Sequence, residues 1–309
     1  MITADAVREA AVGLRGVARR TPLVRVAALD CWLKLENLQP VGAFKIRGAY
    51  TAVRRLPEDA RRRGVITFSS GNHGQALAFA AQRLSCRAVI VMPETAPAVK
   101  VEGVKRWGGE VVLAGRTSED RRIAAERLAQ EQGLAIVPPF DHPDIVAGQA
   151  TVGVEIAEQL PEVQTVVVPV GGGGLISGVV TGLAVAGSGA GVWGVEPVGA
   201  PKLQRSLAAG APVKLDKSAS LADGLITLTV GKLNFAQLQQ HRDRVRGVAL
   251  VEDDSLREAV QFLYRECGMV VEPSGAATTA AVRSGAVRPA GPTVLVVSGG
   301  NVDPALLED

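Results

Sequence analysis

Six short runs of apolar, mostly β-branched residues recur along the chain and limit its fold more than any other feature. Near-continuous apolar runs of four or five residues are typical of parallel strands that are covered on both faces. Because helical patterns separate the runs, the sequence predicts a parallel α/β architecture. The runs are Val65–Phe68, Ala88–Met92, Glu110–Leu113, Val166–Val170, Val192–Glu196 and Val294–Ser298.

Two of the intervening segments show clear helical features. Apolar residues recur at helical spacing from Ser255 to Cys267, with Asp254 or Ser255 as the expected N-cap and Gly268 at the end. A second helix is expected over Thr117–Gln132, which a glycine follows.

Composition excludes several classes of protein. The 309 residues suit two α/β domains or one large one, and the net charge of +3 indicates neither nucleic-acid binding nor a polybasic membrane patch. Three separated cysteines without a CxxC, and no run of about 18 apolar residues, predict a cytoplasmic protein with free thiols. The three histidines lack metal-ligand spacing, and no GxSxG supports a serine triad.

Four successive glycines, Gly171–Gly174, stand between a predicted strand and a helix. Glycine lets backbone N–H groups approach a ligand closely, and the helix start adds a positive dipole end, so a compact phosphate is favoured. A dinucleotide is an alternative, with Glu196 as the ribose-binding acid, but Ser177 stands where the fingerprint needs glycine. A purely structural turn is the third interpretation.

Lys45 has apolar neighbours, Phe44 and Ile46, within GAFKIRGA. Most lysines are solvated surface charges, but an apolar environment lowers a lysine pKa and makes its amine a usable nucleophile. Two polar turns follow predicted strands, one in FSSGNHG and one in VSGGN. The first can hold a carboxylate at a helix start or form an ordinary N-cap.

Taken together, GAFKIRGA, SSGNHGQALA, GGGGL, ADG, VEPSGA and SGGN resemble the fold-type II pyridoxal-phosphate enzymes, within the serine/threonine dehydratase and serine racemase group. The resemblance implies a tryptophan synthase β-like fold of two interwoven domains, with mostly parallel sheets covered by helices. We expect a larger domain over 1–47 plus 143–309, and a smaller one over 48–142.

The resemblance also assigns roles. Lys45 matches the Schiff-base lysine that carries pyridoxal 5′-phosphate, and Ser298 matches the residue facing the ring nitrogen. Further expected cofactor contacts are Phe44, Asn72, Gly171, Gly172, Gly173, Gly174, Leu175, Gly224 and Glu272. The substrate carboxylate is expected at Ser69, Ser70, Gly71, Asn72 and His73.

The chain departs from the family pattern in two places. Ala43 replaces a common serine before Phe-Lys. Members that hold a structural divalent cation use an acid, a carbonyl and a second acid, which here become Glu196, Ala200 and Lys202. We expect the Lys202 ammonium either to replace the cation or to point away.

The implied reaction converts L-threonine, and L-serine, to a 2-oxo acid and ammonia. Ser70, as a second acid/base group, leaves serine racemase as an alternative. An NAD-dependent dehydrogenase and a non-catalytic phosphate-ligand binder are alternatives from other classes. The resemblance suggests a homodimer or homotetramer, and we expect no isoleucine feedback through a C-terminal regulatory domain.

Overall fold

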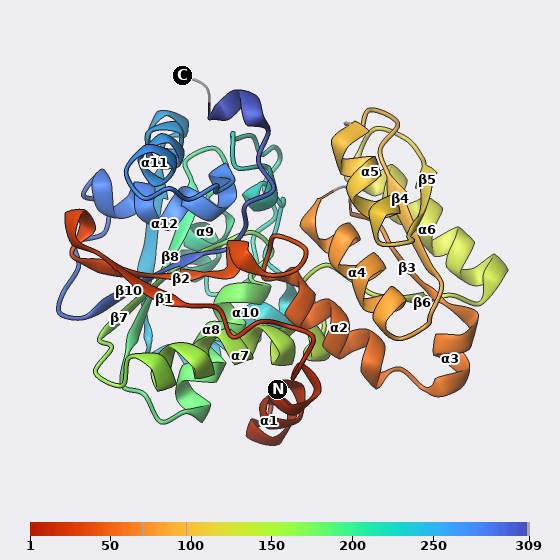
Figure 1. The fold of residues 1–309 in the computed structure, drawn as a ribbon, viewed down its shortest axis with the longest axis horizontal. Coiled ribbons are helices and arrows are strands. Elements are labelled where there is room, and N and C mark those ends of the chain that lie inside the picture. Colours follow the sequence, from red (N-terminus) through yellow and green to blue (C-terminus); the bar gives the residue numbers. More distant parts are fainter. Residues whose placement is uncertain (70, 97, 308–309) are drawn as a thin grey trace.

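The chain folds into two β-sheets that lie side by side, each covered by helices (Figure 1). A computed structural model describes residues 1–69, 71–96 and 98–307. The larger sheet has the order β1 (Leu23–Val26), β2 (Cys31–Leu35), β10 (Thr293–Val297), β7 (Thr165–Pro169), β8 (Gly191–Pro197) and β9 (Val245–Val251). The smaller sheet has the order β5 (Glu110–Leu113), β4 (Ala88–Met92), β3 (Val65–Thr67) and β6 (Ala135–Ile136).

Among these strands every pairing is parallel except that of β1 with β2. All six predicted apolar runs are strands, so the predicted α/β architecture is confirmed. The sequence did not predict β1, β2, β6 or β9.

Alternate residues of the larger sheet enter different cores, as the two-residue repeat of a strand requires. Val167 and Leu295 pack with residues of α11 and α12, whereas Val166 and Val296 pack with residues of α7, α8 and α10. Both faces of this sheet are therefore buried. The covering helices are α7 (Pro143–Gln159), α8 (Gly174–Val185), α10 (Lys232–Gln240), α11 (Asp253–Arg265) and α12 (Pro273–Arg283).

The smaller sheet is covered in the same way. Ile90 packs with residues of α2 and α4, and Val91 packs with residues of α6 on the opposite face. The elements of this part are α2 (Lys45–Arg55), α3 (Glu58–Arg63), α4 (Asn72–Arg83), α5 (Ala98–Arg106) and α6 (Ser118–Gln132). Of two further helices, α1 (Ala4–Gly13) packs on α7, and α9 (Lys202–Ala209) contacts β8 and β9 of the larger sheet.

The two predicted helices form, with two corrections. Thr117 begins α6 with a capping box, and Gly133 ends it in the left-handed conformation, as expected. The last residue of α11 is Arg265 rather than the predicted Cys267, and Gly268, with φ +64° and its N–H donating to the Tyr264 carbonyl, lies just beyond the helix. The predicted N-cap at Asp254 or Ser255 was wrong, because the chain is already helical from Asp253 and Glu252 is the N-cap.

Helix α2 joins the two parts of the molecule. It packs against α7 of the larger sheet and α4 of the smaller one, and Figure 1 shows it running between them. All strands of the smaller sheet fall within residues 48–142. The exact domain boundaries stay a prediction. In the described part of the chain, no helix has the length and apolar character needed to span a membrane.

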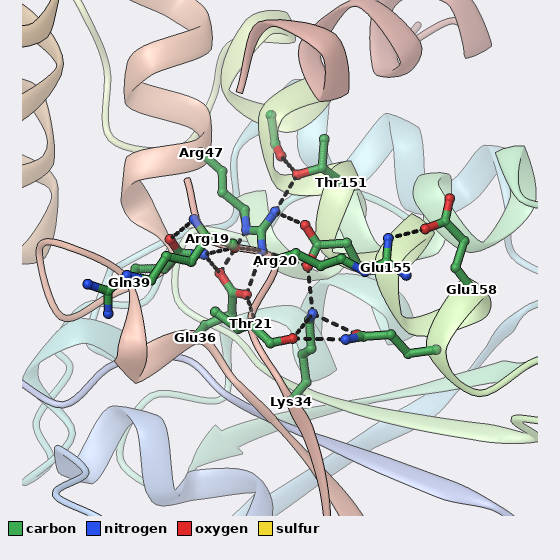
Figure 2. A network of polar contacts seen from close by, with 12 residues as sticks. Arg19, Arg20, Thr21, Lys34, Glu36, Gln39, Arg47, Thr151, Glu155 and Glu158 are labelled. Atoms are coloured by element: carbon green, nitrogen blue, oxygen red, sulfur yellow. Dashed lines mark hydrogen bonds and ion pairs between the residues drawn. The ribbon is translucent and has the colours of Figure 1, made fainter. Parts of the chain in front are cut away.

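A buried cluster of charges fixes α2 to the larger sheet (Figure 2). The Arg47 guanidinium donates to both Glu36 carboxylate oxygens, at 2.8 and 2.7 Å, and to both oxygens of Glu155, at 2.6 and 2.9 Å. Lys34 Nζ donates to Glu155 at 2.6 Å and to the Thr21 carbonyl at 2.8 Å. Two cations, on β2 and α2, thus balance two carboxylates. These belong to Glu36, in the turn after β2, and to Glu155, on α7.

Replacing Arg47 should be costly because it leaves buried carboxylates without their main partner. We expect Arg47→Met to lower the free energy of unfolding by about 3–5 kcal/mol. The control is Arg20→Met, because Arg20 pairs with Glu158 at the surface, where an ion pair contributes about 0–1 kcal/mol. Denaturant unfolding of both variants measures this, and equal losses would contradict a special role for Arg47.

Candidate active site

Loops from both sheets supply the candidate site. Ser69, Gly71 and Asn72 follow β3, Gly171–Gly174 follow β7, and Ser298 follows β10. The carboxyl ends of parallel strands are where open α/β sheets bind ligands. The contacts below join these loops into one site.

Lys45 occupies the first position of α2 and is held from both sides. The Phe44 N–H donates to the Ser298 carbonyl at 3.1 Å, which ties this turn to the end of β10. Lys45 Nζ donates to the Pro139 carbonyl at 2.8 Å and lies 5.2 Å from the centre of the Phe44 ring. Burial lowers the pKa of Lys45 to about 8, against the opposing pull of Glu272. An appreciable fraction of this amine is therefore neutral near pH 7–8.

The glycine loop is built so tightly that side chains could not replace its hydrogens. A Cβ at Gly171 would lie 2.6 Å from the Gly224 carbonyl oxygen, and one at Gly172 would lie 2.3 Å from the Phe140 ring. Gly173 adopts φ +90°, the left-handed region that favours glycine. The first N–H groups of α8 have no partner within the helix. This arrangement is typical of an anion site at a helix start.

A second layer of contacts holds the glycine loop from behind. The Gly172 carbonyl accepts from Asn234 Nδ2 at 2.8 Å and from the Gly231 N–H at 3.0 Å. The Asp141 carboxylate accepts from the Lys232 N–H at 3.0 Å at the start of α10. The side chain of Leu175 is buried in the core, so only its backbone faces the loop.

Asn72 is part of a polar cluster across the site. Asn72 Nδ2 donates to Glu272 Oε1 at 2.6 Å, and Asn72 Oδ1 accepts from Asn301 Nδ2 at 2.7 Å. Asn301 also donates to the Val41 carbonyl at 2.9 Å, four residues before Lys45. This chain of bonds brings the start of α4 and the start of α12 to the segment that carries Lys45.

Ser298 lies buried at the end of β10, with neutral groups around it. The Ser298 hydroxyl is 3.5 Å from the Ser274 carbonyl, and the Ser274 hydroxyl accepts from the Gly224 N–H at 2.9 Å. A hydroxyl in this position can meet a ring nitrogen without bringing a charge to it.

Comparison with known proteins agrees with this geometry. Residues 14–299 match the family model described as "Pyridoxal-phosphate dependent enzyme". The chain belongs to this family. The family resemblance predicted from the sequence is confirmed, and the match favours the compact phosphate of pyridoxal phosphate over a dinucleotide at the glycine loop.

Several relatives have similar sequences or folds. The chain is 37% identical to an L-threonine ammonia-lyase of Thermotoga maritima over 100% of this chain and 78% of that protein. It is 39% identical to an L-threo-3-hydroxyaspartate ammonia-lyase of Pseudomonas sp, over 96% and 94% of the two chains. The maize serine racemase structure superposes with a TM-score of 0.93 at 36% identity, over 98% of this chain and 95% of that one.

A longer relative is matched only in part. The threonine dehydratase of Nicotiana attenuata is 43% identical over 84% of this chain, which spans 44% of that protein.

The expected carboxylate-binding segment is placed at the start of α4. Gly71 is the N-cap of α4, and its N–H lies 3.4 Å from the Ser69 hydroxyl. His73 is buried, and its Nε2–H donates to the Val137 carbonyl at 3.1 Å. Burial, and then the nearby Lys45, lower the pKa of His73 to about 3, so its ring is neutral and adds no cation. Ser70 lies outside the described residues.

The positions expected for a divalent cation are brought together, but with a lysine among them. Lys202 Nζ donates to Glu196 Oε1 at 3.0 Å and to the Ala200 carbonyl at 3.2 Å. The ammonium therefore points inward, and this donor set does not fit a divalent cation. The part of the chain that the structure describes also holds no cluster of three or more His, Cys, Asp or Glu able to bind a metal.

Sequence reasoning missed several residues of the site. Pro139, Phe140 and Asp141 come from the segment after β6, and Asn234 supports the glycine loop. Asn301 stands in the SGGN motif, but its contact with Asn72 was not predicted. The polar, proline-containing PPFDHPD segment follows a short strand, which was the available signal for the first three. Asn234 lies inside α10, and its helical pattern carries no such signal.

Glu272 gives the site a measurable dependence on pH. Burial, reinforced by Asp223, raises the pKa of Glu272 to about 8 from an ordinary 4.5. In the folded protein the carboxyl stays protonated while the unfolded chain ionises, so its stabilising contribution is complete below about pH 4.5. That contribution is lost as the pH rises to about 8.

We therefore expect the free energy of unfolding of the cofactor-free wild type to fall by a few kcal/mol between pH 5 and pH 8, relative to that of Glu272→Gln. This size follows from about 1.4 kcal/mol for each unit of pKa shift. Glu252→Gln, at an exposed position, is the control. Denaturant unfolding at both pH values measures the difference. Parallel pH profiles for wild type and Glu272→Gln would contradict it.

Proposed function

We propose that this chain is a threonine dehydratase that converts L-threonine, and L-serine, to 2-oxobutanoate or pyruvate with release of ammonia. One observation carries the proposal. The half-buried amine of Lys45, with its pKa lowered to about 8, lies where the end of β10 meets the segment after β6. A neutral amine at such a junction can attach a carbonyl cofactor and then serve as a base.

The residues present fit pyridoxal phosphate. Gly171–Gly174 would hold the phosphate through backbone N–H groups, Asn72 would meet the ring hydroxyl, and Ser298 the ring nitrogen. Phe44, Gly224 and Glu272 would border the ring. When bound, the cofactor supplies an electron sink for the pair left by removal of the substrate's α-proton. Ser298 is neutral, so it does not enforce protonation of the ring nitrogen, which favours prompt loss of a β-hydroxyl.

Lys45 would then move the proton. With substrate bound, the Lys45 amine would be free to act as the base that takes the α-proton. Its lowered pKa would let it accept the α-proton at neutral pH. The β-hydroxyl would leave as water with the proton that Lys45 returns, and hydrolysis of the released enamine would yield the 2-oxo acid and ammonia.

The start of α4 would bind the substrate carboxylate. The backbone N–H groups at Gly71 and Asn72 and the Ser69 hydroxyl are neutral donors beside a helix dipole, which suits one carboxylate. The neutral ring of His73 adds no positive charge that would attract a second carboxylate.

Charges near Glu272 bear on the choice among hydroxy-amino acids. Lys100 of α5 is ion-paired with Asp223, across the two parts of the molecule, and both influence the pKa of Glu272. A second carboxylate, as in 3-hydroxyaspartate, would compete with Asp223 for Lys100 and meet like charge. These contacts support threonine and serine over 3-hydroxyaspartate.

Steady-state assays of 2-oxo acid formation test the proposal. We expect turnover of L-threonine and L-serine, with kcat/KM for L-threo-3-hydroxyaspartate at least about tenfold lower, which corresponds to about 1.4 kcal/mol. Asp223→Asn should narrow that gap because it frees Lys100. Lys45→Ala should lower turnover by about 10²-fold or more. Preference of the wild type for 3-hydroxyaspartate, or undiminished activity of Lys45→Ala, would refute the proposal.

Serine racemisation is a second candidate activity, favoured by the hydroxyl at Ser70 and by similarity to the maize racemase. Racemisation needs an acid/base group on the face of the substrate opposite Lys45, and Ser70 would supply it. We expect Ser70→Ala to abolish turnover of D-serine while L-threonine turnover persists. Intact D-serine turnover in Ser70→Ala would rule out the two-base scheme.

A further inference from the structure

Lys202 is a fully buried lysine whose ammonium is surrounded by four oxygen atoms from three segments of the chain. Its Nζ donates to the carbonyls of Val170 and Leu225, each at 2.8 Å, to Glu196 Oε1 at 3.0 Å and to the Ala200 carbonyl at 3.2 Å. All four partners are acceptors. An ammonium has three donors and no acceptor, so this environment matches the charged form.

The surroundings also match the charge of one lysine. Glu196, itself fully buried, supplies a single negative charge. Its carboxylate further accepts from the Leu203 and Gln204 N–H groups, at 2.8 and 3.0 Å, at the start of α9. Burial lowers the pKa of Lys202, and the nearby Glu196 carboxylate opposes this shift.

Two of the four oxygen atoms belong to residues next to the candidate cofactor site. Val170 directly precedes the glycine loop, and Leu225 directly follows Gly224. Gly171 and Gly224 approach each other so closely that a Cβ on Gly171 would lie 2.6 Å from the Gly224 carbonyl oxygen. Lys202 therefore binds the residue before Gly171 and the residue after Gly224, through the carbonyls of Val170 and Leu225. Without it, three carbonyls and a carboxylate would face one another.

We propose that the Lys202 ammonium is a built-in cation that positions the glycine loop against the Gly224 segment, so that the loop is formed without any bound metal ion. Lys202 is a positioning residue, since its contacts are to backbone carbonyls and Glu196. The part of the inference that concerns cofactor affinity rests on the proposed function, whereas the part that concerns the loop's stability does not.

A divalent ion does not suit the same place. Magnesium and calcium take six or more oxygen ligands at about 2.0–2.6 Å, usually with more than one carboxylate. Here four oxygen atoms lie 2.8–3.2 Å from a nitrogen, and one carboxylate is already neutralised.

The first experiment uses the wild-type protein, treated with chelator and then titrated with magnesium, calcium or potassium chloride. We expect the melting temperature of the cofactor-free protein and its affinity for pyridoxal phosphate to be unaffected by chelation or by each cation, beyond the effect of matched ionic strength. A saturable rise in melting temperature with any of these ions would overturn the proposal.

The second experiment removes the ammonium. Lys202→Ala should lower the melting temperature of the cofactor-free protein by several degrees and weaken binding of pyridoxal phosphate by about tenfold or more, as loss of a supporting contact does in other ligand sites. Ammonium or methylammonium chloride should restore both, since either ion can enter the space left by the side chain. Lys217→Ala is the matched control, because Lys217 is exposed and makes none of the contacts described for the site.

The outcomes separate the two claims. Ammonium should raise the melting temperature of Lys202→Ala while leaving that of Lys217→Ala unchanged. This result supports the built-in cation even if the wild type binds no pyridoxal phosphate, which would refute the proposed function alone. A Lys202→Ala protein with wild-type melting temperature and cofactor affinity would refute the positioning role. If Lys202→Ala does not fold, the wild-type titration still decides.

Discussion

The Arg47 guanidinium bears on the placement of every other part of the site. It binds two buried carboxylates, one after β2 and one on α7, and so fixes α2 against the larger sheet (Figure 2). Lys45 lies two residues earlier on the same helix, within its first turn. A buried cluster of this kind tolerates few alternative arrangements, because any shift leaves a charge without its partner. The position of the Lys45 amine therefore follows from an ion cluster that never contacts it.

The remaining site residues reach Lys45 through backbone bonds rather than through side chains alone. Phe44 is bound to the end of β10, and a further pair, Gly42 and Gly300, is joined by a hydrogen bond of 2.9 Å. Asn301 connects this strip to Asn72 at the start of α4. Segments that are hundreds of residues apart thus converge because parallel strands end at the same edge of a sheet. The smaller sheet contributes Asn72, and the larger sheet contributes the glycine loop and Ser298.

The sequence predicted those parts of the fold in which local pattern and burial agree. Buried strands such as β4 and β7 are apolar throughout and were found. β2 was missed because it carries Lys34, a charge that is buried only because Glu155 from a distant helix pairs with it. β9 was missed because arginine and glycine interrupt it, and β6 has only two residues. Long-range pairing of this kind leaves no periodic signal in the chain.

For the site, motifs predicted positions but not electrostatics. Lys45, Asn72 and the glycine loop could be named from sequence, and the structure brings them together. The neutral state of His73 and the raised pKa of Glu272 depend on burial beside Lys45 and Asp223, which no spacing rule reveals. The sequence left two orientations open for the Lys202 side chain, and only the four oxygen atoms around its ammonium decide between them.

The central claim is that Lys45, and no other of the chain's eight lysines, attaches the cofactor. Borohydride reduction of the protein loaded with pyridoxal phosphate, followed by peptide mass mapping, tests this most directly. The account predicts one pyridoxyl group per chain, on the peptide that contains Lys45, and none in Lys45→Ala. A pyridoxyl group on another lysine of the folded wild type, or a fully loaded Lys45→Ala, would contradict it.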